Sequence, residues 1–160
     1  MKLLSPVTIL VLCLFASCQY DPFAGDLTTK RPRFTDVLGT YRLTKQTVNE
    51  KELSKADSAA CIKLIADGTF IVSNLPNFLG DTGKYVSPQS LISSKGKWNI
   101  DVVGGVDNGI GHEKWNWGVV LTNMPDDLAT IGFTGDSPPY GLMITNDDPD
   151  LGRVIVFSKK

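Results

Sequence analysis

The sequence predicts an all-β domain over residues 39–160, folded as an eight-stranded antiparallel up-and-down β-barrel. From residue 39 onward, apolar and polar side chains alternate in short runs, which is typical of strands with one buried face. Residues that favour turns separate these runs, and no amphipathic helix pattern long enough to connect parallel strands lies between them. Antiparallel strands can hide their edges by packing as a sandwich or by closing into a barrel, and short sequential turns favour the barrel.

Eight runs show this alternation, near residues 39–45, 60–66, 69–74, 95–103, 115–122, 128–134, 140–146 and 153–158. A polar stretch at 49–56 predicts a turn of helix between the first two strands. The period of two gathers large apolar residues on one face of each later strand: Trp98, Ile100 and Val102; Trp115, Trp117, Val119 and Leu121; Ile131 and Phe133; Tyr140, Leu142 and Ile144; Ile155 and Phe157. These residues suffice to build a hydrophobic core.

The clearest local element is a hairpin at residues 62–72 with an Asp-Gly turn. A two-residue loop would pair Ile65 with Phe70 and would mix apolar and polar residues on both faces. A three-residue loop with Gly68 in the left-handed conformation pairs Leu64 with Phe70 and makes one apolar face. Because a slip of one residue exchanges the two faces, the sequence predicts the three-residue loop.

The first eighteen residues have the three-part layout of a secretory signal that ends at a lipidation site. A single lysine precedes an apolar run from Leu3 to Phe15, and two small residues lie before Cys18. The run is too short to span a bilayer, because a transmembrane helix needs roughly 20 apolar residues. This segment resembles the lipobox of bacterial lipoproteins, which implies that residues 1–17 are removed and that the Cys18 sulfur carries lipid.

Acyl chains on Cys18 would hold the protein on a membrane, since each buried CH₂ contributes about 0.8 kcal/mol and several chains together bind stably. Gln19 follows the cysteine in place of the aspartate that resembles an inner-membrane retention signal, so we expect the outer membrane of the cell envelope. Residues 18–38 contain two prolines, a glycine and no sustained apolar period, which predicts a lipidated cysteine and a flexible tether.

Charge and composition predict no nucleic-acid partner. Without residues 1–17 the chain has 15 basic and 17 acidic residues, a net charge of −2. The one basic cluster, Lys30, Arg31 and Arg33, is interpreted as part of a solvated tether, and contact with anionic headgroups or the cell wall is the alternative. About 140 residues of ordinary globular composition predict one domain, which we expect to be monomeric.

The sequence shows no combination of side chains typical of catalysis or metal binding, so we expect neither an enzyme nor a cofactor. His112, the only histidine, follows the glycine-rich loop 104–111 without a Gly-x-Ser-x-Gly elbow or a placed cysteine, and is interpreted as a surface residue. The acidic run 146–152 lacks the glycine and glutamate spacing of an EF-hand and indicates a β-turn. Asp126 and Asp127 are interpreted in the same way.

Cys61 is the one cysteine that remains besides the lipidated residue, because Cys13 leaves with the signal. Its thiol either packs as a small apolar group or takes part in redox or intermolecular chemistry. Lys63 is the only cation close to it in sequence, so packing is the favoured interpretation.

Short motifs at strand starts and turns carry a family resemblance. They are Gly-Thr-Tyr-Arg-Leu at 39–43, Ala-Asp-Gly-Thr-Phe at 66–70, Gly-Lys-Trp at 96–98, and Pro-Tyr-Gly-Leu at 139–142 leading into 148–152. Over most of residues 39–160 this pattern resembles the lipocalin-like (calycin) lipoproteins of bacteria, with Tyr41 in the position of the family's first-strand tryptophan. The resemblance implies an eight-stranded barrel with a small apolar ligand at its mouth.

Two functions follow from these observations. In the first, the barrel binds a small hydrophobic ligand, because aromatic side chains bind apolar ligands and sugars. The candidate ligand-binding residues are Trp98, Trp115, Trp117, Phe133 and Tyr140. In the second, apolar side chains fill the interior and the outer loops dock a protein or glycan of the envelope. Core packing is the alternative role for the tryptophans of the 115–122 run, because apolar residues continue their face.

Overall fold

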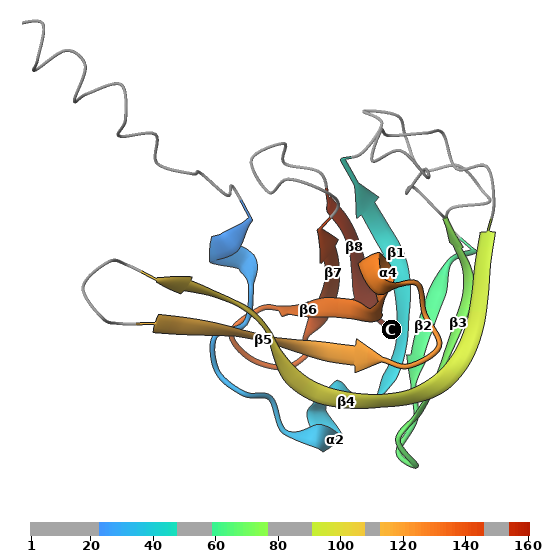
Figure 1. Ribbon diagram of the computed structural model, residues 1–160, viewed down its shortest axis with the longest axis horizontal. Coiled ribbons are helices and arrows are strands. Elements are labelled where there is room, and N and C mark those ends of the chain that lie inside the picture. Colours follow the sequence, from blue (N-terminus) through green and yellow to red (C-terminus); the bar gives the residue numbers. More distant parts are fainter. Residues whose placement is uncertain (1–22, 48–58, 77–90, 108–112, 146–153) are drawn as a thin grey trace, which may run out of the picture.

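The computed structural model describes residues 23–47, 59–76, 91–107, 113–145 and 154–160, and these residues form one antiparallel sheet (Figure 1). Each strand pairs with the next along the chain, and the last pairs with the first, so the sheet closes on itself. The strands are β1 (Gly39–Gln46), β2 (Cys61–Leu64), β3 (Thr69–Pro76), β4 (Leu91–Asp107), β5 (Glu113–Leu121), β6 (Thr130–Thr134), β7 (Gly141–Thr145) and β8 (Val154–Lys159). The predicted antiparallel, up-and-down order is confirmed.

All eight predicted runs coincide with strands, and the main difference lies in the length of β4. The alternation predicts residues 95–103, whereas β4 spans Leu91–Asp107. Its first part pairs with β3 and its second part with β5. The added residues are Leu-Ile-Ser-Ser at 91–94 and Gly-Gly-Val-Asp at 104–107, which do not alternate, so backbone pairing lengthens the strand where the side-chain pattern stops. The predicted helical turn at 49–56 lies outside the described residues.

The β2–β3 hairpin has the predicted register. Leu64 pairs with Phe70, and the Ile65 N–H donates to the Thr69 carbonyl across a three-residue loop. Gly68 has a φ of 76°, in the left-handed region. The Asp67 carboxylate accepts hydrogen bonds from the hydroxyl of Thr69 and from the backbone N–H of Thr69 (2.8 Å). Both bonds lower the pKa of Asp67, and the bond from the hydroxyl has the larger effect.

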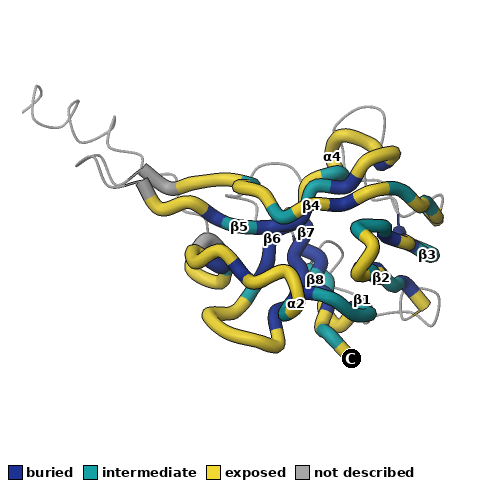
Figure 2. The backbone as a smooth tube through the Cα atoms, turned by 90° about the horizontal axis from the view of Figure 1, so that it is seen from below, coloured by how far each residue is buried: buried dark blue, intermediate teal, exposed yellow. Residues whose placement is uncertain are grey.

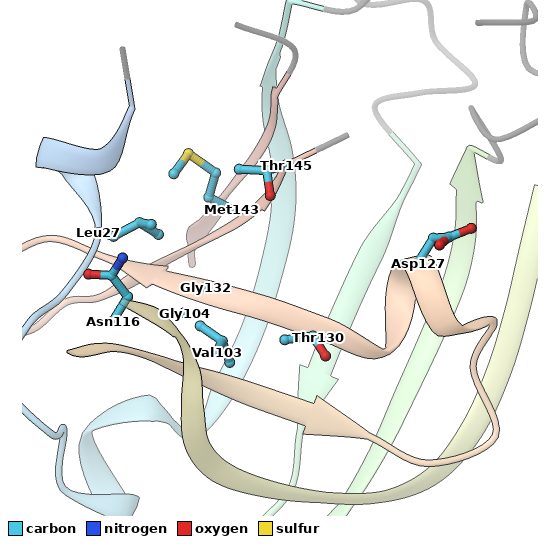
Figure 3. A pocket seen from close by; sticks show the side chains of 9 residues that line it. All are labelled: Leu27, Val103, Gly104, Asn116, Asp127, Thr130, Gly132, Met143 and Thr145. Atoms are coloured by element: carbon cyan, nitrogen blue, oxygen red, sulfur yellow. The ribbon is translucent and has the colours of Figure 1, made fainter. Parts of the chain in front are cut away.

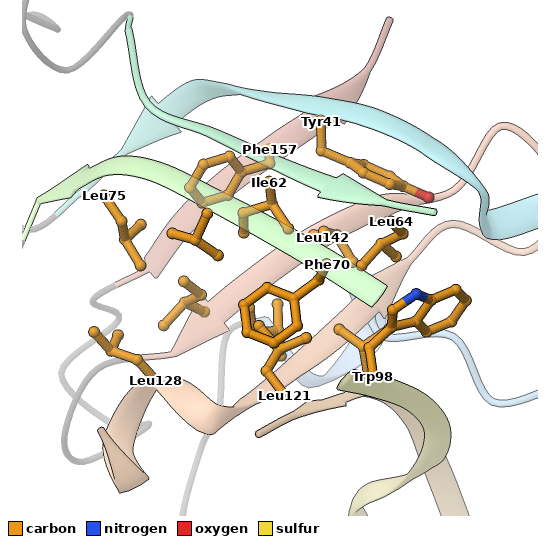
Figure 4. Close-up of a cluster of buried hydrophobic side chains, with 14 of the residues drawn as sticks. Tyr41, Ile62, Leu64, Phe70, Leu75, Trp98, Leu121, Leu128, Leu142 and Phe157 are labelled. Atoms are coloured by element: carbon orange, nitrogen blue, oxygen red, sulfur yellow. The ribbon is translucent and has the colours of Figure 1, made fainter. Parts of the chain in front are cut away.

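Apolar side chains fill the interior of the closed sheet (Figure 4). Alternate residues of each strand point inward, and an eight-stranded ring is just wide enough for such side chains to occupy its interior. The largest fully buried side chains on the strands are Tyr41, Ile62, Leu64, Phe70, Leu75, Ile131, Phe133, Leu142, Ile144, Ile155 and Phe157. The predicted core faces of the last three strands are therefore confirmed.

A short helix, α2 (Phe34–Val37), covers one end of this interior. Val37 is fully buried, and its carbonyl accepts a hydrogen bond of 2.6 Å from the hydroxyl of Tyr41. Burial raises the pKa of Tyr41. The ammonium group of Lys159, on β8, donates to the carbonyl of Asp36 (2.7 Å), as expected for a cation near a helix C-terminus. These bonds attach α2 to β1 and β8.

Another short helix, α4 (Asp126–Ala129), follows β5 and contributes the buried residue Leu128. Figure 4 shows Leu128 and Leu75 at one end of the buried cluster and Trp98 at the other. The predicted turn at Asp126 and Asp127 is thus the first turn of a helix, where carboxylates are favoured by the helix dipole.

Residues 23–38 differ from the flexible coil that the sequence predicts. After a 3₁₀ turn, η1 (Ala24–Asp26), the chain runs against the sheet. The Thr28 N–H donates to the Phe133 carbonyl, the Thr28 carbonyl accepts from the Trp117 N–H, and the Gly135 N–H donates to the backbone carbonyl of Asp26. These contacts use backbone groups rather than a periodic apolar face. Hydrogen bonds of this kind leave no apolar periodicity in the sequence.

We expect Gly68→Ala to lower the free energy of unfolding by roughly 1 kcal/mol or more, because a Cβ is disfavoured at a positive φ. No heavy atom lies within 4 Å of the position that the Cβ would take, so the loss measures backbone strain alone. Gly25→Ala is the matched control, since its Cβ would also contact nothing and its φ is not positive. Denaturant unfolding that gives the same midpoint for both variants would contradict the bulged turn.

Candidate functional site

The outer parts of β4 and β5 leave the closed sheet together as a two-stranded ribbon, residues 103–107 and 113–117, which we call the β4–β5 ribbon (Figure 1). A register shift between Val102 and Gly104 marks the point of departure. β5 pairs with β6 only from Gly118 to Val120, and beyond that point Thr28 lies between the two strands, bonded to both. The ribbon therefore splays from the sheet where the N-terminal segment enters.

A pocket of about 240 Å³ lies at this splay point, on the outer face of β5, β6 and β7 (Figure 3). Its apolar walls are Leu27, Val103 and Met143, and its polar groups come from Asn116, Asp127, Thr130 and Thr145. Two glycines allow the walls to approach the sheet. A Cβ on Gly132 would lie 2.5 Å from Leu27 Cδ2, and one on Gly118 would lie 2.6 Å from Val103 Cγ1. Larger residues there would displace both walls.

Asn116 is the most unusual residue of this pocket. Its side chain is only 6% exposed. Among the described residues, the structure gives its carboxamide no hydrogen-bond partner. Within the described ranges, the one fully buried side-chain polar atom without a partner is Gln46 Oε1, so the polar atoms of Asn116 remain accessible from the pocket. In Figure 3 the amide nitrogen of Asn116 is directed toward Leu27, another residue of the pocket lining. A buried amide that no protein group satisfies is suited to bind a ligand there.

Three of the five predicted ligand-binding residues lie in the core or close one end of it. Phe133 and Tyr140 are buried, with ring centroids 6.1 Å apart and planes tilted by 52°. Trp98 is buried, and its Nε1–H donates to the carbonyl of Ile65 (3.1 Å). Its indole stacks on Phe34 of α2 at 4.8 Å and 3°. Each of these rings already has the contacts of a structural side chain.

The other two candidates belong to the β4–β5 ribbon. Trp117 is half-buried beneath Arg31, whose guanidinium carbon lies 5.2 Å from the ring centroid. Trp115 is 49% exposed and covers the backbone of Gly105, where a Cβ would lie 3.0 Å from the ring. The alternative prediction, that Trp115 and Trp117 pack in the core, is wrong for Trp115. The structure does not bring the five aromatic residues together into one site.

The residues that line the splay-point pocket were missed by sequence reasoning. Asn116 stands between two tryptophans on the opposite face of an alternating strand, which predicts a solvated polar residue. In the folded chain it is buried and lines a pocket together with Leu27 and Met143, which are far from it in sequence. No local pattern encodes that contact.

A second pocket, of about 380 Å³, lies beside α2 and is lined by Arg31, Pro32, Phe34, Trp98, Asn99 and Ile100. It has no comparable unpaired buried group, since the Trp98 Nε1–H is already bonded to Ile65. Cys61 is a half-buried free thiol on β2. Cys18, His112 and the acidic run 146–152 lie outside the described residues.

Within the described residues, no three histidine, cysteine, aspartate or glutamate side chains are grouped so that they could hold a metal ion. A search of the same residues finds no helix with the length and apolar character needed to cross a membrane. Comparisons of the chain with models of protein families, with curated proteins and with solved structures found no match.

The Phe34–Trp98 stack gives a direct test of how the N-terminal segment is attached. We expect Phe34→Ala to lower the free energy of unfolding by about 1–2 kcal/mol and to make tryptophan fluorescence more accessible to acrylamide, because the indole loses its cover. Ile71→Ala is the matched control: Ile71 has the same exposure of 43% but lies on β3. If both variants quench like the wild type, the stack does not shield Trp98.

Proposed function

We propose that this chain is a lipid-anchored protein of the bacterial cell envelope, in which a lipocalin-like barrel acts as a non-enzymatic interaction module. The observation that carries the proposal is the filled interior of the closed sheet combined with apolar surface on the projecting β4–β5 ribbon. A filled interior leaves the outer surface as the place where binding occurs. The ribbon is the part of that surface that we assign to a partner.

The interior packing favours docking over the carriage of a small hydrophobic ligand. A carrier needs an apolar cavity that the ligand fills. Here Phe70, Phe133 and Phe157 are fully buried among neighbouring core residues. The two pockets described above lie outside the core, near Asn116 and beside α2. A ligand inside the barrel would have to displace well-packed aromatic side chains, which costs several kcal/mol.

The β4–β5 ribbon has the properties of a docking element. Residues 99–107 of β4 pair on one side with β5 and have no second partner strand among the described residues. Unpaired strand edges are ready templates for another chain or for polar ligands. Trp115 and Val102 are exposed beside this edge, and tryptophan is enriched at binding hot spots. Figure 2 shows the ribbon extending from the buried part of the sheet, largely exposed.

The lipid anchor and the attached N-terminal segment would keep this module near its membrane. The segment contacts the sheet from Asp26 onward, and the described residues begin at Phe23. Phe23 lies five positions after Cys18, and a fully extended chain spans at most about 3.6 Å per residue. The barrel would then lie within about 18 Å of the lipid. A partner of the ribbon would accordingly be a protein or glycan close to the membrane surface.

The anchor is tested by membrane fractionation. We expect Cys18→Ser to move the protein from the membrane fraction to the soluble fraction, because acyl chains supply the stable attachment. Cys61→Ser is the matched control and is expected to stay in the membrane fraction, since Cys61 lies on β2. Equal membrane retention of both variants would contradict lipid anchoring at Cys18.

The docking role is tested by photo-cross-linking in intact cells. A photoreactive amino acid in place of Trp115 is expected to give discrete adducts, whereas the same group in place of Ile71, an exposed apolar residue of β3, is not. With the photoreactive group moved to the exposed position of Val102, Trp115→Ala should abolish capture of that partner while changing the free energy of unfolding by less than about 0.5 kcal/mol. Native mass spectrometry that finds a stoichiometric apolar molecule inside the barrel would instead establish the carrier function.

A further inference from the structure

The splay-point pocket is a built site rather than a surface hollow. The N-terminal segment contributes Leu27 to its lining, and β4 contributes Val103, which lies at the register shift. Asn116 lies beneath them, more than nine-tenths buried, with its amide unpaired among the described residues. In Figure 3 the carboxamide is at one end of the pocket and Asp127 is at the other. Recognition at the buried end therefore depends on one carboxamide.

At the buried end of the pocket, the carboxamide of Asn116 is complementary to a ligand that carries an amide. A carboxamide presents a donor and an acceptor side by side, and a ligand amide presents the complementary pair. Next to Asn116, the walls formed by Leu27 and Met143 are apolar and suit a methyl group. Thr130 and Thr145 also line the pocket and are exposed residues, so their hydroxyls can bond ligand hydroxyls. The three zones together match an acetamide attached to a polyhydroxylated ring.

The charge of the pocket lining and the volume of the pocket narrow the class of ligand further. Among the described residues, no lysine, arginine or histidine lines the pocket, and Asp127 is the one ionisable residue of its lining. An anionic ligand would find no cation there and would meet a carboxylate. The volume of about 240 Å³ lies below the roughly 300–1,000 Å³ of sites for drug-sized ligands, so it fits one sugar ring and not a lipid.

We propose that the splay-point pocket binds a neutral N-acetylated amino sugar, with the acetamide bonded to Asn116 and the ring hydroxyls toward Thr130 and Thr145. The inference goes beyond the docking role proposed for the ribbon. Trp115 and Asn116 are neighbours on a strand, so their side chains lie on opposite faces and can be tested separately.

The test is a titration of the purified, ¹⁵N-labelled protein with N-acetylglucosamine, followed by NMR. We expect millimolar sugar to shift the side-chain amide signals of Asn116 and the backbone signals of Gly132 and Met143. Glucose, which lacks the acetamide, should leave them unchanged at the same concentration. N-acetylmuramic acid, which adds a carboxylate, should bind more weakly than N-acetylglucosamine.

The variant Asn116→Leu keeps the size of the side chain and removes its hydrogen-bonding groups. It should weaken sugar binding by about tenfold or more, while the protein unfolds at the same or a higher denaturant concentration. Asn99→Leu, on the exposed face of β4, is the matched control and should bind like the wild type. If Asn116→Leu does not fold, Asn116 is structural and the inference fails.

Other results also overturn the inference. An absence of shifts with N-acetylglucosamine means that the pocket holds only solvent. Equal shifts with glucose mean that the acetamide is not recognised. Shifts confined to residues outside the pocket place the sugar elsewhere. Each of these results leaves cross-linking through Trp115 as an independent measure of the docking role.

Discussion

The architecture depends on one backbone interaction, the insertion of Thr28 between β5 and β6. Its N–H donates to Phe133 on β6 and its carbonyl accepts from Trp117 on β5, both at 2.9 Å. Because Thr28 occupies the hydrogen-bonding groups that the two strands would otherwise share, β5 separates from β6 beyond Gly118. The projecting ribbon, the pocket at its base and the burial of Asn116 all follow from this separation. The segment that connects the barrel to its proposed anchor thus also shapes the proposed binding surface.

The filled interior determines which functions remain open to the molecule. Antiparallel strands in this number enclose a space that side chains can just fill, and aromatic rings from β3, β6 and β8 fill it here. α2 closes one end through Val37 and the hydroxyl of Tyr41. Rigid packing of this kind supplies stability and a fixed scaffold, and it leaves recognition to the outside. The glycines on the outer face, Gly118 and Gly132, provide the space that the interior lacks.

The sequence predicts most of the fold because strand formation here has a local signature. Alternation locates all eight strands, and the demand for one apolar face selects the three-residue loop at Gly68 over a two-residue loop. The five aromatic residues predicted to bind a ligand, in contrast, do not form one site. The same alternation assigns Trp98, Trp115 and Trp117 to equivalent faces, yet the first is buried, the last is half-buried and Trp115 is exposed. Periodicity reports the face of a strand and not whether that strand has left the sheet.

The sequence by itself determined the antiparallel order, the hairpin register and the core faces of the late strands, because each depends on contacts between neighbours along the chain. It also supplies the features that predict export and lipidation at Cys18. Only the tertiary structure decided that residues 23–38 belong to the folded domain, that β4 and β5 splay outward, and that Asn116 is buried without a partner. These outcomes depend on Asp26 and Thr28 meeting residues more than eighty positions away, through backbone groups that every sequence possesses. Such contacts carry no pattern in the side chains.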